Sequence, residues 1–364
     1  MMMKVLVNSR FLSQNISGVQ RFAIEISRGL KKNYNNIEFL SPAKIIHKEI
    51  AKELNVITVG KSSSHLWEQF ELPLFIKKNY SSQPFILVNL ANSAPILIDR
   101  NLITIHDLTV IKYSSSYSFL YATFYKIIFN IIIKKALHIF TVSESSKRDI
   151  VEKFHLRPAK ITVVYNAVAK IFINNISESN ENFNLPIKEK YILTVSMFNP
   201  LKNLHRLLQA FEMLEKKPIK LIIVGGHYKS FKKIKEIEKY RTNPDIIFLG
   251  QLNDVQKLVT LYKHAELFVF PSIYESFGIP TLEAMACGCP VVVSRAGALP
   301  EVCEDAAIYI EDPFNVITIK NAMQSVLNNS YLKNKLRILG FEQVKKFRWE
   351  RSVQILLGKI TSIQ

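Results

Sequence analysis

Cysteine is scarce in this sequence. Its 364 residues include three cysteines, Cys287, Cys289 and Cys303, which are too few for the disulfide framework of a small secreted protein. Cys287 and Cys289 are two residues apart, but no pair of histidines lies near them to complete a zinc site. We therefore expect neither a disulfide scaffold nor a bound metal, and we interpret the three cysteines as small buried residues.

Long apolar runs are also absent. The nearest approach, over residues 117–133, is interrupted by Lys126 and Asn130, whereas a membrane-spanning helix needs about 20 predominantly apolar residues. The opening residues, MMMKVLVNSR, lack the apolar stretch of a signal peptide and predict a first strand instead. The sequence thus predicts a cytoplasmic protein, and it leaves peripheral contact with the inner face of the cell membrane open.

Acidic residues are too few to balance the basic ones. The formal net charge is +18, from 48 Lys and Arg against 30 Asp and Glu. The excess is spread over both halves and favours anionic partners, namely phosphates, anionic lipid surfaces or nucleic acid, although a basic proteome would also explain it. No clustered basic face or RNA-recognition signature is visible, which disfavours nucleic acid. No G-x-G-x-x-G occurs either, which argues against a dehydrogenase.

Short apolar runs alternate with helical patterns along both halves of the chain, and a polar stretch over residues 173–187 separates the halves. This order predicts an α/β protein with two doubly wound parallel sheets, whose ligands sit at the carboxyl ends of the strands. We expect an N-terminal domain over 1–175, a linker over 176–187, a C-terminal domain over 188–345 and a helix over 346–364 that packs back toward the first domain. In the second half, strands are expected over 191–196, 219–224, 246–249, 267–270 and 291–294. Helices are expected over 203–216, 229–241, 255–264 and 280–287.

The most informative stretch is FPSIYESFGIPTLEAMACGCP, residues 270–290. A predicted strand leads into a loop with Glu275 and Gly278, and Pro280 begins a helix with Glu283 in its first turn. Gly278 lets the backbone approach a ligand closely, and the new helix points free N–H groups toward that ligand. An acid in a first helical turn also suits the helix dipole, so Glu283 has a purely structural explanation as well.

Here the sequence resembles glycosyltransferase family 4, whose members have two facing Rossmann-like domains, the GT-B fold. Glu275 and Glu283 match the family's Glu-x7-Glu signature, and the flanking segments GALPEV and DAAIYIEDP match as well. The resemblance implies that Glu275 contacts the donor sugar and that Glu283 binds the ribose hydroxyls, as ionised carboxylates do well. It also implies that the backbone at Phe277, Gly278 and Ile279 lines the sugar and phosphate pocket in an interdomain cleft.

A second segment, SMFNPLKNLHRLLQAF, resembles the family's diphosphate-binding segment. The resemblance implies that Lys202 stabilises the departing nucleoside diphosphate; a solvent-exposed lysine is the alternative. Many relatives place an arginine nearby, so either Lys202 acts without it or another residue, such as Arg206, supplies the second charge. We also expect Ser196, Gly225 and Leu252 to bind substrate in the same pocket.

The first half carries two further matches. NISGVQRFAIEI resembles the family's glycine loop, which implies that Gly18 passes close to the diphosphate with a helix N-terminus aimed at it; a plain helix-starting glycine is equally consistent. LITIHDL resembles the family's strand ending in histidine, which implies that His106 hydrogen-bonds the transferred sugar. Asp107 would orient His106 or simply cap a turn. Ser143 is interpreted as a helix N-cap without a catalytic role.

Two segments bear on the acceptor. HLWEQFELPLF, residues 65–75, resembles a segment of bacterial polysaccharide-assembly members, in which Glu68 would shape the acceptor side; we favour a surface helix anchored by Trp67. Residues 117–135 combine aromatic and aliphatic side chains with lysines. They predict either a surface at a membrane interface or a helix buried in the first domain.

By this resemblance, we expect a retaining hexosyltransferase in cell-surface polysaccharide synthesis. The expected partners are a nucleotide-sugar donor, favoured as GDP-mannose, a glycan or polyprenyl-linked glycan acceptor, and an anionic membrane surface, but no nucleic acid. No cofactor and no metal are expected, because the Asp-x-Asp of metal-dependent donor sites is missing. A dTDP- or UDP-sugar donor and a nucleotide-sugar epimerase stay open, and a basic nucleic-acid-binding protein is the alternative from another class.

Overall fold

The computed structural model describes residues 3–174, 189–215, 218–226, 235–252 and 254–363. The predicted linker over 176–187 lies outside these ranges, and so does the first half of the helix expected over 229–241. Contacts divide the chain into two compact units. The first comprises Met1–Lys112, Ala122–Asn166 and Arg348–Gln364, and the second comprises Tyr113–Tyr121 and Ala167–Phe347.

The first unit is built on a seven-stranded sheet of order β3-β2-β1-β4-β5-β6-β7. Its strands are β1 (Lys4–Asn8), β2 (Ile37–Ser41), β3 (Ile57–Thr58), β4 (Phe85–Asn89), β5 (Asn101–Thr104), β6 (His138–Thr141) and β7 (Ile161–Val163). All neighbouring strands are parallel, so their carboxyl ends share one edge. The strand order changes direction between β1 and β4, which is the point where doubly wound sheets bind ligands.

The helices before residue 167 connect these strands. They are α1 (Gly18–Asn33), α2 (Lys48–Leu54), α3 (Ser64–Leu66), the π-helix η2 (Trp67–Glu71), α4 (Leu72–Tyr80), α5 (Thr109–Lys112), α6 (Phe119–Lys135) and α7 (Glu144–Phe154), with short 3₁₀ turns η1 (Arg10–Ser13), η3 (Ser114–Ser116) and η4 (Pro158–Lys160). Trp67, Leu72 and Ile76 pack with Leu6 and Leu87 of the sheet in one buried cluster. Trp67 is therefore a core anchor, as predicted.

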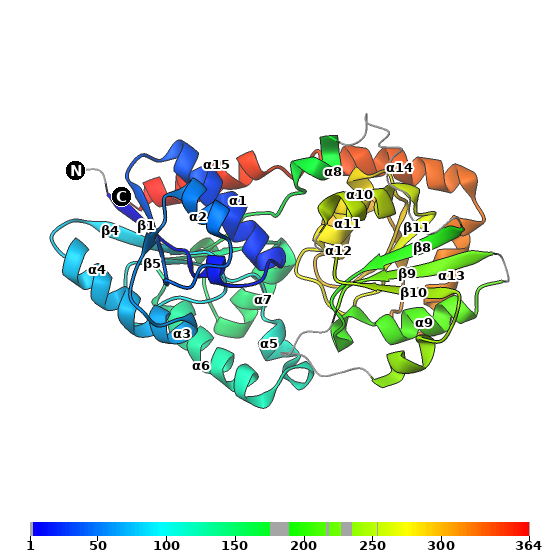
Figure 1. The fold of residues 1–364 in the computed structure, drawn as a ribbon, viewed down its shortest axis with the longest axis horizontal. Helices are drawn as coiled ribbons and strands as arrows, with labels where there is room; N and C mark the ends of the chain where they lie inside the picture. The colour runs from blue at the N-terminus through cyan, green and yellow to red at the C-terminus, as the bar shows by residue number, and fades with distance from the viewer. Residues whose placement is uncertain (1–2, 175–188, 216–217, 227–234, 253, 364) are drawn as a thin grey trace. The chain divides into compact units, whose positions relative to one another are not determined.

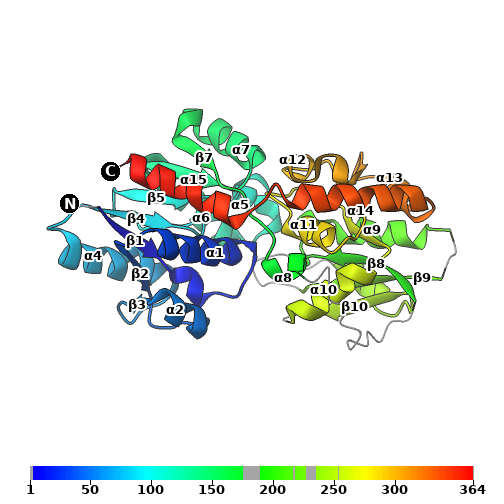
Figure 2. The same ribbon diagram turned by 90° about the horizontal axis from the view of Figure 1, so that it is seen from above.

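The last helix of the chain, α15 (Trp349–Ser362), belongs to the first unit and lies beside α1 (Figure 2). The rings of Phe22 and Trp349 have centroids 6.1 Å apart. The helices approach closely because Gly29 has no side chain: a Cβ there would lie 2.2 Å from Cγ2 of Val353. Ser352 adds a hydrogen bond from Oγ to the carbonyl of Tyr165, 2.6 Å long.

The second unit holds a six-stranded parallel sheet of order β10-β9-β8-β11-β12-β13. Its strands are β8 (Lys190–Val195), β9 (Ile219–Val224), β10 (Ile246–Gly250), β11 (Leu267–Phe270), β12 (Val291–Ser294) and β13 (Ile308–Ile310). Its helices are α8 (Lys170–Asn174), η5 (Pro200–Lys202), α9 (Leu204–Glu212), η6 (Lys235–Tyr240), α10 (Val255–His264), α11 (Ile279–Ala286), α12 (Leu299–Cys303), η7 (Glu304–Ala306), α13 (Val316–Leu327) and α14 (Ser330–Val344). The strand order changes direction between β8 and β11.

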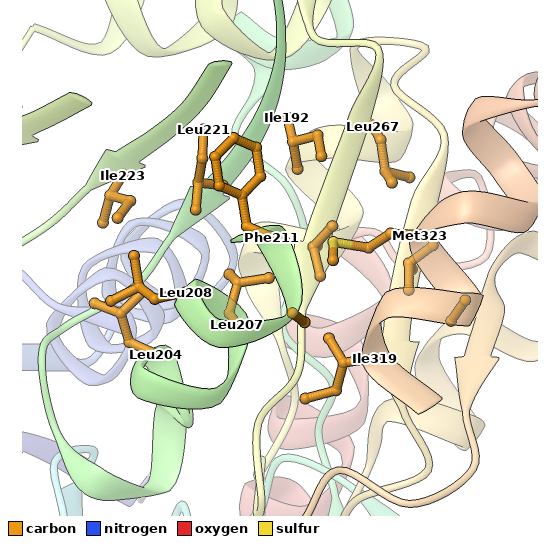
Figure 3. Packing of buried hydrophobic residues seen from close by; sticks show 14 of the residues in the cluster. Ile192, Leu204, Leu207, Leu208, Phe211, Leu221, Ile223, Leu267, Ile319 and Met323 are labelled. Atoms are coloured by element: carbon orange, nitrogen blue, oxygen red, sulfur yellow. The ribbon is translucent and has the colours of Figure 1, made fainter. Parts of the chain in front are cut away.

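Apolar side chains between the sheet and two helices form the core of this unit. Figure 3 shows Leu207 and Phe211 of α9 gathered with Leu221 of β9, and Ile319 and Met323 of α13 nearby. The other buried members of the cluster come mainly from β8, β9, β11, α9 and α13. These contacts pack α9 and α13 against the strands whose ends carry the predicted site.

The predicted α/β class with two doubly wound parallel sheets is confirmed, and four expected elements have the observed bounds: β9, β11, β12 and α10. The helix expected over 203–216 is shorter, because α9 ends at Glu212. The described part of the helix expected over 229–241 is a 3₁₀ turn, η6. Among the helices within the described ranges, none has the length and apolar character needed to cross a membrane.

Candidate active site

Lys202 and Glu275 form an ion pair at the edge of the second unit's sheet. Lys202 ends η5, just after β8, and Glu275 lies in the loop between β11 and α11. The Lys202 ammonium also lies 5.0 Å from the ring centroid of Phe270. The two side chains are only 15% and 12% exposed. Because β8 and β11 flank the point where the strand order changes direction, the pair occupies the usual ligand position of such a sheet.

Local hydrogen bonds explain why Lys202 meets Glu275. Asn203 adopts a left-handed backbone conformation with φ of 58°, and its side-chain amide donates to the carbonyl of Pro271 over 3.1 Å. The N–H of Ile273 donates to the carbonyl of Leu201 over 2.7 Å. These two bonds tie the segment of Lys202 to the loop of Glu275.

A glycine after β12, Gly297, packs against the backbone of Glu275. Gly297, with φ of +57°, follows β12, and a Cβ on it would lie 2.1 Å from the carbonyl oxygen of Glu275. The next residue, Ala298, donates its N–H to the same carbonyl over 2.8 Å. Gly297 is therefore a positioning residue that our sequence reasoning missed. The glycine of the GALPEV segment was the available signal, but the contact partner was not predictable from it.

Glu283 is held on α11 and is 4% exposed. Gly278 caps the start of this helix with φ of 92°, and its carbonyl accepts the hydroxyl of Thr281 over 2.7 Å. The hydroxyl of Tyr262, on α10, donates to Oε2 of Glu283 over 3.3 Å. Burial, and then the charge of Glu283, raise the pKa of Tyr262 well above its ordinary value, so the tyrosine stays protonated and keeps donating.

On the expectation from the sequence that Glu283 binds a nucleotide sugar, replacing Tyr262 with phenylalanine should raise KM for that donor about fivefold and leave kcat within about twofold, because the lost hydrogen bond to Glu283 is worth about 1 kcal/mol. Steady-state kinetics with varied donor would measure both constants. Tyr240→Phe is the matched control, since Tyr240 is another buried tyrosine of the same unit. An unchanged KM for Tyr262→Phe would argue against this role.

The other predicted residues of the second unit lie at strand ends or at the start of α11. Ser196 follows β8 and Gly225 follows β9, and the two are in contact: with φ of +140°, Gly225 has room for no Cβ, which would lie 1.8 Å from the Ser196 carbonyl oxygen. Leu252 follows β10 and is partly buried. Phe277 turns its side chain into the core, where its ring centroid lies 5.5 Å from that of Phe347, so only its backbone is available to line a pocket. Ile279 is the first residue of α11.

Arg206, which we considered as a second charge, is held at the start of α9. Its guanidinium donates to Oδ1 of Asn203 over 2.9 Å and lies 5.2 Å from the ring centroid of Phe314. It thus reinforces the residue that positions the Lys202 segment.

Within the ranges that the structure describes, no group of three or more His, Cys, Asp or Glu is arranged to hold a metal ion.

In the first unit, His106 is buried just after β5. Its Nε2 lies 3.0 Å from the carbonyl of Leu90, a contact that requires Nε2 to donate and leaves Nδ1 as the acceptor. Burial lowers the pKa of His106, and the Leu90 carbonyl only partly offsets that effect, so the imidazole is neutral at pH 7. Oδ1 of Asp107 accepts the N–H of Thr109 over 2.8 Å, which is the turn-capping alternative. Gly18 is the exposed first residue of α1.

A buried polar cluster that we did not predict lies at the carboxyl ends of β1 and β4 of the first unit. Glu68 is fully buried and accepts from Nε of Arg10 over 3.2 Å, from Asn8 over 2.8 Å and from Ser93 over 2.8 Å. His65 approaches its second oxygen at 3.3 Å. Glu68, which we expected on a surface helix, is thus the centre of an ion-pair network. Its partners come from separate segments of the chain, so no local sequence pattern predicts the cluster.

The chain matches two family models that follow one another along the sequence. Residues 16–170 match Glycosyltransferase Family 4, and residues 175–342 match Glycosyl transferases group 1. Among curated proteins, it is 29% identical over 245 residues to the serotype-specific mannosyltransferase WbdA of Escherichia coli, covering 63% of this chain and 29% of WbdA. It is 32% identical over 238 residues to the O-antigen chain mannosyltransferase B of Escherichia coli, covering 60% of this chain and 61% of the relative.

Solved structures share the fold over nearly the whole chain. Anabaena Alr3699/HepE in complex with UDP-glucose superimposes with a TM-score of 0.76 at 16% identity, covering 99% of this chain and 100% of that one. Sucrose-phosphate synthase from Thermosynechococcus elongatus gives 0.73 at 20% identity, covering 98% of both chains. The matched regions span less than two thirds of the length of the curated relatives named above.

Proposed function

The chain belongs to glycosyltransferase family 4 and has the GT-B fold, and we propose that it transfers a hexose from a nucleotide-sugar donor to a hydroxyl of a glycan or polyprenyl-linked glycan. The observation that carries the proposal is the Lys202–Glu275 ion pair at the β8–β11 junction, with Glu283 on the adjoining α11. An ammonium suits a diphosphate, and carboxylates suit the paired hydroxyls of a sugar and a ribose.

GDP-mannose is the donor that we propose. The support is indirect, namely the names of the mannosyltransferases at 29% and 32% identity. A dTDP- or UDP-sugar is the competing donor class, and it would use the same ammonium and the same two carboxylates. The donor panel described below distinguishes these bases.

For the chemical step, we propose a retaining front-side transfer without a metal. The bond between C1 of the sugar and the phosphate oxygen breaks, and the bond to the acceptor oxygen forms on the same face. The acceptor proton passes to the leaving phosphate oxygen, whose charge is met by Lys202 and by the N–H groups at the start of α11. Neutral His106, with Nδ1 as an acceptor, would hold a sugar hydroxyl. An inverted product anomer by NMR, or a trapped glycosyl adduct on Glu275, would contradict this route.

Donor binding provides the first test. At about 100 times its dissociation constant, GDP-mannose is expected to raise the free energy of unfolding by about 2.7 kcal/mol, measured by calorimetry against dTDP-rhamnose and UDP-glucose, with and without EDTA. The proposal further requires GDP release and a mannosylated acceptor by mass spectrometry. Glu283→Ala should lose most of the thermal shift. If no nucleotide sugar shifts the transition, the proposed donor site is wrong.

A further inference from the structure

The Lys202–Glu275 ion pair joins two side chains for which we expect different ligands. We expect the Lys202 ammonium to face a diphosphate and the Glu275 carboxylate to face a sugar, yet in this structure each is the partner of the other. Among the described residues, Glu275 is the acid that lies within ion-pair distance of Lys202. An ammonium that is already neutralised by a carboxylate attracts a second anion less strongly.

The pair is sheltered from water, so its two charges depend on each other. The side chains are only 15% and 12% exposed, and the ammonium also lies against the ring of Phe270. Charges held away from bulk water attract each other more strongly than an exposed surface pair does, and either one is destabilised when it loses its partner. A diphosphate can therefore bind Lys202 fully only when the ion pair is broken.

Backbone contacts hold both ends of the pair, so an exchange of partners requires only that side chains rotate. The strands β8 and β11, which precede the two residues, are neighbours in the sheet, and α11 packs beside β11 (Figure 1). The amide of Asn203, next to Lys202, donates to the carbonyl of Pro313 over 2.6 Å. The carbonyl of Glu275 accepts the N–H of Ala298 over 2.8 Å. Neither backbone depends on the ion pair for its position.

A nucleotide sugar and a nucleoside diphosphate differ in what they supply to this pair. The nucleotide sugar supplies a diphosphate for Lys202 and sugar hydroxyls that can donate to Glu275. The nucleoside diphosphate supplies the same kind of anion but no sugar. When it binds Lys202, Glu275 becomes a largely buried carboxylate without its cation, which is costly. Glu275 therefore opposes binding of the product more than binding of the donor.

We propose that Glu275 competes with the diphosphate for Lys202 and thereby makes the site favour a nucleotide sugar over a nucleoside diphosphate. The two side chains are paired in the free protein, and the donor replaces the partner of each. After transfer the sugar leaves, Glu275 pairs with Lys202 again, and this pairing promotes release of the nucleoside diphosphate. The inference rests on the proposed function, because it requires the diphosphate at Lys202.

The test is isothermal titration calorimetry of the full chain with GDP and GDP-mannose, and with UDP and UDP-glucose. Glu275→Gln keeps the size of the side chain and its hydrogen-bonding oxygen but removes the charge. It should bind the nucleoside diphosphate about tenfold more tightly than wild type, as expected for a close charge pair. It should bind the nucleotide sugar within about threefold of wild type, because a weaker contact with the sugar offsets the gain at Lys202.

Two further comparisons identify the cause of the gain. In a Lys202→Ala background, Glu275→Gln should no longer tighten binding of the nucleoside diphosphate, because the ammonium for which the two anions compete is absent. Glu266→Gln is the matched control. Glu266 pairs with Lys333, whose side chain is also 15% exposed, but it precedes β11 whereas Glu275 follows it. This variant should bind all four nucleotides like wild type, and circular dichroism would verify the fold of each protein.

Nucleoside diphosphate binding by Glu275→Gln that is no tighter than in wild type would overturn the inference. So would an equal gain in the Lys202→Ala background or in Glu283→Gln, because the gain would then come from any loss of negative charge and not from competition for one ammonium. If neither wild type nor Glu275→Gln bound any of the four nucleotides, the proposed function would fail together with the inference. The two failures are thus distinguishable.

Discussion

Replacing Lys202 with alanine is expected to lower kcat for sugar transfer by roughly 10²–10³-fold. The ammonium lies at the β8–β11 junction, paired with Glu275. The next cation along the segment, Arg206, instead hydrogen-bonds Asn203 and lies against the ring of Phe314. Charge on the leaving diphosphate grows as the sugar bond breaks, so an ammonium at that position stabilises the transition state more than the bound donor. The loss should therefore appear mainly in kcat.

The measurement is nucleoside diphosphate release at saturating donor. Lys333→Ala is the matched control, because Lys333 is paired with Glu266 in the same unit and its side chain is also 15% exposed. Glu266 precedes β11, at the opposite edge of the sheet from Glu275. Lys202→Arg should retain more activity than Lys202→Ala because it keeps the charge. A Lys202→Ala enzyme that turns over within about threefold of wild type would remove Lys202 from the mechanism.

Replacing Glu68 with alanine is expected to lower the free energy of unfolding of the first unit by about 3–5 kcal/mol. The change leaves the buried guanidinium of Arg10 without its carboxylate, and an uncompensated buried charge is costly. Arg10→Met/Glu68→Leu should recover much of the loss, because it removes both charges together. Glu53→Ala, which breaks an exposed pair with Arg28, should cost less than about 1 kcal/mol.

Tryptophan fluorescence during denaturant unfolding measures this effect selectively. The sequence has two tryptophans, Trp67 and Trp349, and both belong to the first unit. The fluorescence transition therefore reports the unfolding of that unit even when the second unit unfolds separately. A Glu68→Ala transition within about 1 kcal/mol of wild type would contradict the assigned role of the buried cluster.

The pH dependence of the same transition follows from Glu68. Burial raises the pKa of Glu68, but the charge of Arg10 and the hydrogen bonds of His65 and Asn8 outweigh it and lower the pKa from 4.5 to about 2. A lowered folded-state pKa means that the stabilisation is fully present above about pH 4.5 and is lost as the pH falls through 2. Wild type should thus lose up to about 3 kcal/mol more than Glu68→Gln across this interval.

Local patterns were sufficient for the elements around the candidate site. The apolar runs of β9, β11 and β12 end at turn residues, and the cap and apolar periodicity of α10 mark a helix, so each had its predicted bounds. Strands β2, β3 and β13 were missed: β3 has two residues, both exposed, and β13 has three. Runs this short acquire their structure from neighbouring strands, and no window of the sequence contains that information.

The residues of the candidate site also fall into those that local patterns predicted and those that they did not. The spacing of Glu275 and Glu283 and the resemblance of the Lys202 segment predicted residues that the structure places in the segments that follow β8 and β11, two neighbouring strands. Gly297 and Tyr262 were not predicted, because each acts through a contact with a residue far along the chain. The roles of Glu275, Glu283, Lys202 and His106 in binding and transfer stay predictions until the substitutions above are measured.

The return of α15 to the first unit has a consequence for biosynthesis. The ribosome must complete the whole second unit before Trp349 emerges to cover Phe22 on α1. At ordinary translation rates this interval is on the order of ten to forty seconds. The second unit, whose sheet strands follow one another without interruption, can fold first, while the nascent first unit waits with an apolar helix uncovered. The exposed apolar side chains of α1 are the part of the nascent chain that a chaperone would be expected to bind.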